Sequence, residues 1–149
     1  MQIELKKLEK YIDIYDIFRI LKKENNKKIA FLDSSLKNKY GRYSIIGIDP
    51  YLELKENNKK FYINDVLSEE NFEEYLAKFL NENKQENDSL LPLISGGIVY
   101  FSYDYGRKFE NIATRHKKDL DIPEAIVTFY KTYIVEDIEK QEIYISCQD

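Results

Sequence analysis

The chain has 149 residues, of which 43% are hydrophobic and 14% aromatic, so it can build the core of one globular domain. Its net charge is −4, and lysine and glutamate run along its whole length, which excludes the strongly basic face that a nucleic-acid partner would need. The single cysteine, Cys147, excludes an internal disulfide and a cysteine-based metal site. The opening segment MQIELKKLEK lacks the apolar core of a signal peptide, and no apolar run could span a bilayer. We therefore expect a cytoplasmic protein with no membrane partner.

The first predicted element is a helix. Asp13 is a suitable N-cap, apolar residues follow at helical spacing from Ile14 to Leu21, and the helix is expected to stop near Asn25. Residues 28–32 are then predicted to form a short buried strand.

Further strands are predicted after this one. Residues 43–48 form the next, and Asp49-Pro50 marks its end, because proline cannot donate a hydrogen bond to a sheet ladder. Residues 51–55 and 59–63 flank Asn57-Asn58. Asparagine tolerates the positive φ of a tight turn, so these two segments are predicted to form a hairpin.

A second helix is predicted to begin at Ser68 as its N-cap. Glu69 and Glu70 would lie in the first turn, where negative charge suits the helix dipole. An apolar stripe at helical spacing is interpreted as the face that packs on a sheet, in preference to a face that binds a partner. The residues of this stripe are Phe72, Tyr75, Leu76, Phe79 and Leu80.

The second half of the chain is predicted to be rich in β-structure. An apolar run covers residues 98–101, and residues 125–135 form a long β-rich segment. Residues 142–146 can pair with that segment across a turn at 137–140. The order of helix, strands, helix and strands predicts the α+β class with a largely antiparallel sheet, in a single domain that covers residues 1–149.

Residues suited to catalysis are scarce. His116, the one histidine, lies in a basic stretch without an acid or nucleophile partner and is interpreted as a surface residue. Cys147 is interpreted as a bystander on the last strand. Gly96-Gly97 lacks the Lys-Ser/Thr of a phosphate-binding loop and the third glycine of a dinucleotide fingerprint. We therefore predict no catalytic residue and no metal site in this chain.

A first candidate site follows the predicted strand 28–32. A buried strand that ends in serines, then an arginine between two tyrosines, would gather hydroxyls, backbone amides and rings around one small polar-aromatic ligand. The alternative is that Ser34 and Ser35 satisfy loop amides and the tyrosines fill the core. The candidate ligand-binding residues are Asp33, Ser34, Tyr40, Gly41, Arg42 and Tyr43.

A second candidate segment runs from the glycine pair to a charged turn. Asp104 could cap a helical turn, and Arg107 could pair with Asp104 or Glu110. The alternative is a structural salt bridge that holds the corner between a strand and a loop. The residues of this segment are Gly96, Gly97, Tyr103, Asp104, Arg107 and Glu110.

Taken together, these two segments resemble the N-terminal domain shared by anthranilate synthase component I and aminodeoxychorismate (para-aminobenzoate) synthase component I. The resemblance covers nearly the whole chain in the same order and at similar spacing. In one place the family pattern is not matched, because the further glycine that usually precedes the aromatic residue is missing between Gly97 and Tyr100. The matching motifs are Leu32-Asp33-Ser34, Arg42 to Gly47, Asp49-Pro50, Leu91-Pro92, Gly96-Gly97, Tyr103-Asp104, Arg107, Phe109-Glu110, Ile122-Pro123 and Glu136-Asp137.

This resemblance implies a non-catalytic role. In the family, a C-terminal chorismate-binding domain carries the chemistry and holds Mg²⁺, and a separate glutamine amidotransferase subunit supplies ammonia. Gly106 favours the aminodeoxychorismate branch of para-aminobenzoate and folate biosynthesis, in which chorismate becomes 4-amino-4-deoxychorismate. The alternative branch is anthranilate synthase component I of tryptophan biosynthesis. The implied partners are therefore the C-terminal chorismate-binding domain and the amidotransferase, and the chain alone is expected to be inactive.

The resemblance also implies a tryptophan pocket. In relatives the Leu-acidic-Ser segment and the Arg-Tyr loop line this pocket, which implies Ser34 and residues 40–43 here, with Asp33 as a partner for the amino group of L-tryptophan. The rest of the pocket belongs to the other domain, so weak or absent binding is expected from this chain alone. A different hypothesis is a stand-alone module that senses an aromatic amino acid or docks an amidotransferase. The segments 96–97 and 103–110 are interpreted as a structural motif that faces the other domain.

Overall fold

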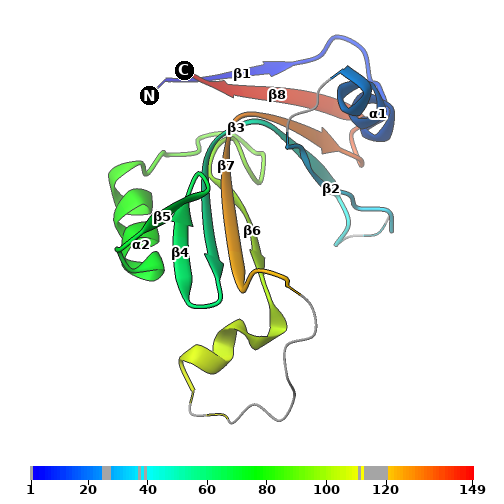
Figure 1. Ribbon diagram of the computed structural model, residues 1–149. Helices are drawn as coiled ribbons and strands as arrows, with labels where there is room; N and C mark the ends of the chain where they lie inside the picture. Colours follow the sequence, from blue (N-terminus) through cyan, green and yellow to red (C-terminus); the bar gives the residue numbers. More distant parts are fainter. Residues whose placement is uncertain (1, 25–27, 37, 39, 111, 113–120) are drawn as a thin grey trace. The chain divides into compact units, whose positions relative to one another are not determined.

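The computed structural model describes residues 2–24, 28–36, 38, 40–110, 112 and 121–149. Within these residues, eight strands form one sheet in the order β1-β8-β7-β3-β4-β5, with β2 paired to β3 and β6 paired to β7 (Figure 1). The result is the predicted α+β fold with a mostly antiparallel sheet. The elements in chain order are β1 (Ile3–Lys7), α1 (Ile14–Glu24), β2 (Ala30–Leu32), β3 (Tyr43–Asn57), β4 (Lys60–Ile63), β5 (Val66–Ser68), α2 (Phe72–Glu82), β6 (Gly97–Phe101), the 3-10 helix η1 (Tyr103–Lys108), β7 (Ala125–Asp137) and β8 (Glu142–Gln148).

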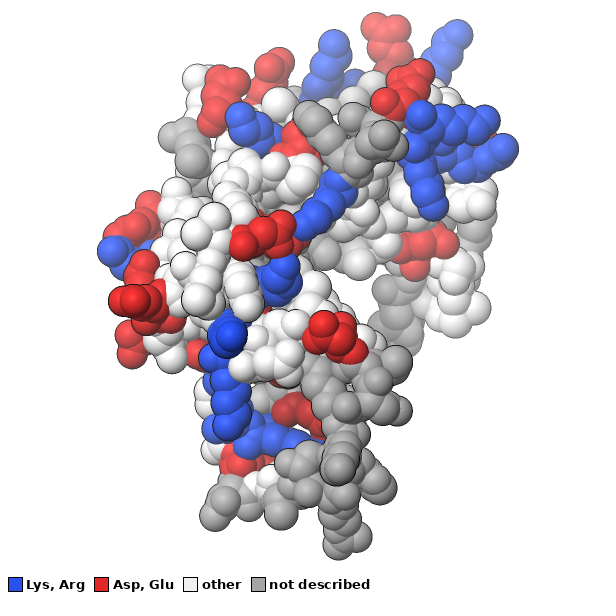
Figure 2. Space-filling view, viewed as in Figure 1, with Lys and Arg blue, Asp and Glu red and all other residues white. Residues whose placement is uncertain are grey.

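The chain divides into two compact units, and the strands β3 and β7 contribute residues to both. None of the helices in the described part of the chain is long and apolar enough to cross a membrane. On the face that Figure 2 shows, basic and acidic side chains are intermixed, as the even spread of lysine and glutamate along the sequence implies. The first unit comprises Met1–Tyr51, Gln85–Gly97 and Phe129–Asp149, and the second comprises Leu52–Lys84 and Ile98–Thr128.

In the first unit, α1 packs on the strands. Asp13 precedes this helix as predicted, and its carboxylate accepts a hydrogen bond from the Tyr15 N–H at 2.9 Å. Phe18 of α1 stacks on Phe31 of β2 with ring centroids 4.7 Å apart. Burying each large apolar side chain here contributes about 1.5–3 kcal/mol to folding. The buried cluster joins one helix and three strands through Ile14, Ile46, Ile134 and Ile143.

In the second unit, α2 packs on the hairpin of β3 and β4, beside β5 (Figure 1). The ring of Phe61 on β4 contacts Phe72 and Tyr75 of α2, each with centroids 5.5 Å away. Phe72 and Phe61 are almost completely buried, so the apolar stripe of this helix serves core packing as interpreted. Leu80, at the end of the same stripe, stays 48% exposed.

The predicted strand end at Asp49-Pro50 is wrong, because β3 continues through both residues to Asn57. Asp49 adopts a positive φ of 56°, a conformation that aspartate tolerates better than most residues. β2 pairs with residues 45–47 and β4 with residues 54–57, so Pro50 lies between these two pairings and withholds no hydrogen bond from either.

The prediction that Ser68 is the N-cap of the second helix, α2, is wrong. Ser68 ends β5, and its hydroxyl accepts a hydrogen bond from the Glu70 N–H at 3.2 Å. Asn71 caps the helix instead, since its side-chain oxygen accepts from the Glu74 N–H at 3.0 Å. Glu73 and Glu74, rather than Glu69 and Glu70, therefore occupy the first turn.

Two tight hairpins follow β3, of which the sequence analysis predicted one. The predicted turn lies one residue further along, at Asn58 and Lys59, which have φ values of 51° and 60°. Asn64 and Asp65 form a second turn of the same kind between β4 and β5, with φ values of 49° and 66°. Two successive residues with positive φ match the right-handed twist of the flanking strands.

The long C-terminal hairpin agrees with the prediction. β7 pairs with β8 in antiparallel register from Thr132 with Cys147 to Asp137 with Glu142. β1 pairs with the outer edge of β8, and no strand was predicted for its residues. Its sequence IELKK carries three charges, so it lacks the apolar pattern that predicts a strand.

Candidate functional site

Three of the predicted ligand-binding residues meet where β2 leads into β3. The Ser34 hydroxyl donates to the Tyr43 carbonyl at 2.6 Å, and the Ser34 N–H donates to the hydroxyl of Ser44 at 3.1 Å. Ser44 is fully buried and donates in turn to the Asp33 carboxylate at 3.4 Å. The hydroxyl proton of Ser34 is thus donated to a main-chain carbonyl of this protein. Asp33 is the exposed residue of this group.

Arg42 forms a two-pronged ion pair within the same unit. Its Nη2 and Nε donate to the Asp137 carboxylate at 2.7 and 3.1 Å, and Glu139 lies 3.3 Å from its Nε. The guanidinium carbon also stands 5.0 Å from the centre of the Tyr43 ring. The hydrogen bonds from Arg42 lower the pKa of Asp137, and the N–H of Lys140 lowers it further. The arginine therefore ties the loop to the β7–β8 turn.

Tyr40 and Gly41 form the turn that leads into β3. Their N–H groups donate to the side-chain oxygen of Asn38 at 2.8 and 3.0 Å. A Cβ on Gly41 would lie 2.2 Å from the carbonyl oxygen of Leu36, so only glycine fits this close approach. The Tyr40 side chain is 84% exposed and does not fill the core. The six predicted residues therefore lie between the end of β2 and the first residue of β3, and Asp33 and Tyr40 are the exposed ones among them.

The glycine pair has a structural role at the start of β6. Gly96 adopts a φ of 129°, which favours glycine, and its carbonyl accepts a hydrogen bond from the buried Tyr133 hydroxyl at 2.5 Å. Gly97 is the first residue of β6.

The charged turn that follows β6 is η1. Asp104 does not cap it, because Ser102 holds the N-cap place and Asp104 lies inside the first turn. The predicted pairing of Arg107 with Asp104 is present at 3.0 Å. The Glu110 N–H donates a hydrogen bond to the Arg107 carbonyl at 3.3 Å. The Tyr103 side chain is 98% exposed.

A cluster that the sequence analysis missed lies in the second unit. Lys108 Nζ is 2.7 and 2.9 Å from the two carboxylate oxygens of Glu56 and 2.5 Å from Glu73. The Tyr105 hydroxyl donates to the same Glu73 oxygen at 2.6 Å. Glu56 and Lys108 are 52 residues apart, so no local spacing could have shown that they meet.

The shifted pKa values in this cluster all move away from neutral pH. Burial alone would lower the pKa of Lys108, but its hydrogen bonds to Glu56 and Glu73 outweigh that effect and raise it. Burial alone would raise the pKa of Glu73, but hydrogen bonds from Lys108 and Tyr105 lower it. Burial and the Glu73 carboxylate raise the pKa of Tyr105. A general acid or base works best with a pKa near the operating pH, so this cluster is suited to holding structure.

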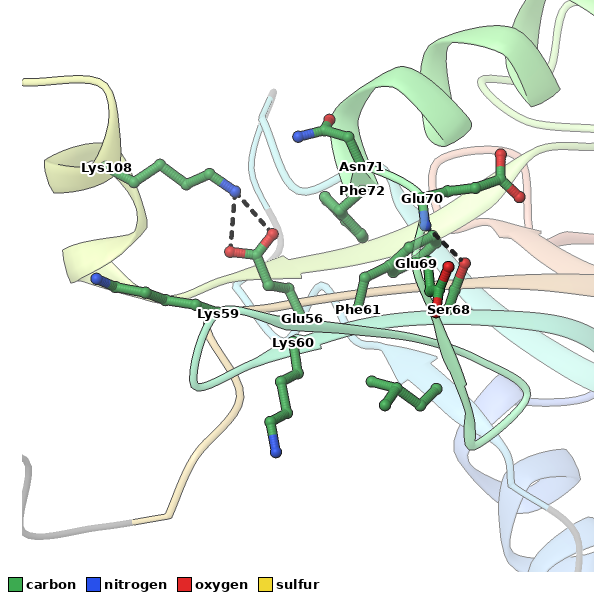
Figure 3. Close-up of a pocket in the computed structure, with 11 residues that line it drawn as sticks. Glu56, Lys59, Lys60, Phe61, Ser68, Glu69, Glu70, Asn71, Phe72 and Lys108 are labelled. Atoms are coloured by element: carbon green, nitrogen blue, oxygen red, sulfur yellow. Dashed lines mark hydrogen bonds and ion pairs between the residues drawn. The ribbon is translucent and has the colours of Figure 1, made fainter.

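A cavity of about 570 Å³ opens beside this cluster (Figure 3). The buried rings of Phe61 and Phe72 contribute to its lining, and Lys108 reaches across its edge to Glu56. Its polar lining includes Lys59, Lys60, Ser68, Glu69, Glu70 and Asn71.

Of the two residues considered for catalysis, the structure describes only Cys147. Cys147 is an exposed free thiol whose sulfur lies 3.6 Å from the Thr132 hydroxyl. His116 lies outside the described residues. Within the described ranges, no three or more His, Cys, Asp or Glu side chains are grouped so that they could hold a metal ion.

Comparisons with known proteins place this fold. No family model matches the chain. The crystal structure of anthranilate synthase component I from Streptococcus pneumoniae superposes with a TM-score of 0.62 and 24% identity, covering 89% of this chain and 29% of that one. The fold is therefore that of part of a synthase component I.

Curated relatives identify the family. Anthranilate synthase component 1 of Acetivibrio thermocellus is 31% identical over an alignment 146 residues long, and the match covers 93% of this chain and 30% of that protein. Aminodeoxychorismate synthase component 1 of Klebsiella aerogenes is 30% identical over 59 residues, which are 40% of this chain and 13% of that protein. The chain belongs to the family of anthranilate synthase component I and aminodeoxychorismate synthase component I, and it spans about 30% of the length of the Acetivibrio relative.

Proposed function

We propose that this chain is the N-terminal, non-catalytic part of a chorismate-using synthase component I. The observation that supports this most strongly is the pair of coverages with the Acetivibrio relative, because nearly all of this chain matches less than a third of that protein. The interpretation of residues 1–149 as one N-terminal domain belongs to this proposal. A cytoplasmic setting belongs to it as well, since a free exposed thiol such as Cys147 suits a reducing compartment.

In this proposal the chemistry occurs in the catalytic part of the synthase. Chorismate would react there with ammonia that a separate glutamine amidotransferase releases. Mg²⁺ would also be held there, as the resemblance to the family implies. The chain contributes a folded wall and a docking surface to that reaction.

The anthranilate branch is the better-supported of the two. The anthranilate relative matches 93% of this chain and the aminodeoxychorismate relative 40%, and the similar crystal structure belongs to the anthranilate branch. Gly106 alone favours the aminodeoxychorismate branch, so the coverage of the relatives reverses the order that this residue predicts. That branch remains the second candidate, supported by the Klebsiella relative and by the motif Gly106 to Glu110.

We also propose that Asp33, Ser34 and residues 40–43 form one wall of a tryptophan pocket. The exposed carboxylate of Asp33 could receive the amino group of the ligand, and the exposed Tyr40 ring could pack on the indole. Ser34 and Arg42 would shape this wall, because their side chains bond within the chain. One wall gives little burial, so we expect weak or no tryptophan binding by the isolated chain. A stand-alone sensing module would instead give saturable binding in calorimetry that is lost on changing Ser34 and Arg42.

The branch can be tested genetically. A genomic segment that carries this chain with its neighbouring coding sequence would be introduced into bacteria that require tryptophan and into bacteria that require para-aminobenzoate. Growth of the first strain without tryptophan is expected. Growth of only the second would favour the aminodeoxychorismate branch, and growth of neither would contradict the proposed function.

A further inference from the structure

The outer edge of β6 has no strand beside it in the described part of the chain. β6 pairs with β7 and with no other described strand. The N–H and C=O of one residue in a strand point to one edge, and those of the next residue point to the other edge. About half of the main-chain N–H and C=O groups of residues 98–101 therefore face away from β7. The Ser102 N–H donates to the Glu124 carbonyl at 2.8 Å and holds the end of β6 in place. The open edge is therefore a fixed template for another strand.

The side chains along this edge are apolar and exposed. Val99 is 55% exposed, Tyr100 42% and Phe101 45%. Phe101 packs against Tyr105 of η1 with ring centroids 4.7 Å apart, and Phe109, which is 63% exposed, lies 5.6 Å from the same ring. The apolar surface thus extends from β6 onto η1.

Other outer strands of the sheet carry the features that prevent strand addition. β1 bears Glu4, Lys6 and Lys7 along its five residues. β5 has only three residues and is flanked by Asp65 and Glu69. Natural proteins use short edge strands and edge charges of this kind to block further pairing.

β6 lacks these features. It has five residues, and no charged residue occurs in the sequence between Asp88 and Asp104. Its segment Ile98–Phe101 is rich in β-branched and aromatic residues, which favour strand pairing. β1 and β5 carry features that block strand addition, and the exposed edge of β6 does not. This difference indicates that another segment covers the edge of β6.

We infer that the outer edge of β6 is a docking edge to which the catalytic part of the synthase adds an extended strand. This inference rests on the proposed function, which supplies the occupant. In the Acetivibrio relative the matched segment belongs to a protein about three times as long as the match, so much further chain is available to cover the edge. Strand addition satisfies the open backbone groups of β6 as well as its side chains, which a helix could not do.

The test uses a chimera in which this chain replaces the matched segment of the Acetivibrio anthranilate synthase component 1. Amide exchange of residues 98–101 is measured by NMR or mass spectrometry in the isolated chain and in the chimera. The amides that face β7 are protected in both proteins. The outward-facing amides should exchange quickly in the isolated chain and about tenfold or more slowly in the chimera, because a new strand protects them.

A matched pair of variants separates docking from folding. Val99→Lys places a charge on the β6 edge, and Val66→Lys places the same charge on β5, where Val66 is 69% exposed. In the isolated chain neither variant should change the melting temperature appreciably. In the chimera Val99→Lys should restore fast exchange of the outward-facing amides, and Val66→Lys should leave them protected.

Each outcome decides something. A chimera that makes anthranilate but keeps fast-exchanging outer amides overturns the docking edge and leaves the proposed function standing. Protection in the isolated chain that rises with its concentration also overturns it, since a second copy would then be the occupant. A chimera whose two parts unfold independently counts against the proposed function itself.

Discussion

At Gly41 the main chain passes so close to the Leu36 carbonyl that a single methyl group would force the two apart. We expect Gly41→Ala to lower the free energy of unfolding by about 1–3 kcal/mol, the usual cost of overpacking. Gly106→Ala is the matched control, because a Cβ there meets no atom within 4 Å. It should change stability by less than about 0.5 kcal/mol. Equilibrium urea denaturation measures both, and equal stabilities for the two variants would show that the loop relaxes freely.

Asp137 links stability to acid pH. It is 2% exposed and hydrogen-bonded to Arg42, which lowers its pKa in the folded state. The stabilisation is therefore complete above the unfolded-state pKa of about 3.9 and is lost as the pH falls through the folded value. Asp137→Asn should make the free energy of unfolding less dependent on pH in the acid range. It should also lower the free energy of unfolding at pH 7 by about 1–3 kcal/mol.

The control for this prediction is Glu139→Gln, which removes the exposed carboxylate on the same arginine. It should cost about 1 kcal/mol or less at pH 7, since it is a surface ion pair. Chemical denaturation at a series of pH values gives the comparison. An Asp137→Asn variant that keeps the full acid dependence would mean that other carboxylates cause it.

At the scale of elements, the start of α2 distinguishes the observed cap from the predicted one. Asn71→Ala removes the side chain that accepts from the Glu74 N–H and should cost about 0.5–2 kcal/mol. Ser68→Ala removes a bond to the Glu70 N–H ahead of the helix and should cost less. The reverse order in thermal denaturation would restore Ser68 as the cap.

The Lys108 cluster holds η1 to β3 and α2. Lys108→Met would leave Glu56, which is 7% exposed, without its charged partner and should cost about 1–3 kcal/mol. Lys55→Met is the matched control, because Lys55 pairs with the exposed Asp65 carboxylate, and it should cost about 1 kcal/mol or less. Equal losses for the two variants in urea denaturation would show that the cluster contributes no more than a surface pair.

Local patterns predicted those elements whose cause is local. The α1 helix follows from Asp13 and a helical stripe, and the β7–β8 hairpin from two β-rich runs around a turn. The continuation of β3 through Pro50 depends on where β2 and β4 pair, which no short window of sequence contains. Choosing between Ser68 and Asn71 as a cap likewise required knowing that β5 ends at Ser68.

The same division applies to the candidate sites. The pairing of Asp104 with Arg107 is three residues apart and could be predicted. The bond from Arg42 to Asp137 joins residues 95 apart, and the Lys108 cluster joins three segments, so both required the folded chain. The resemblance to the family relied on motifs along the whole chain, so it indicated the family, but it predicted neither of these contacts.

At the scale of the whole molecule, the described groups with shifted pKa values keep their charge states in the folded chain. The shifted lysine and tyrosine pKa values rise and the shifted carboxylate values fall, so these groups hold fixed charge states at neutral pH. Under the proposed function, a chain of this kind would contribute to catalysis through what it holds in place. The proposed function therefore predicts that the reacting groups lie in the part of the synthase that this chain does not match.

Chorismate consumption by the purified chain, with Mg²⁺ and ammonium present, tests this directly when it is measured beside the chimera with the Acetivibrio catalytic part. We predict no turnover by the chain alone and ammonia-dependent formation of anthranilate by the chimera. Chorismate turnover by the isolated 149-residue chain would contradict the assignment of a non-catalytic part.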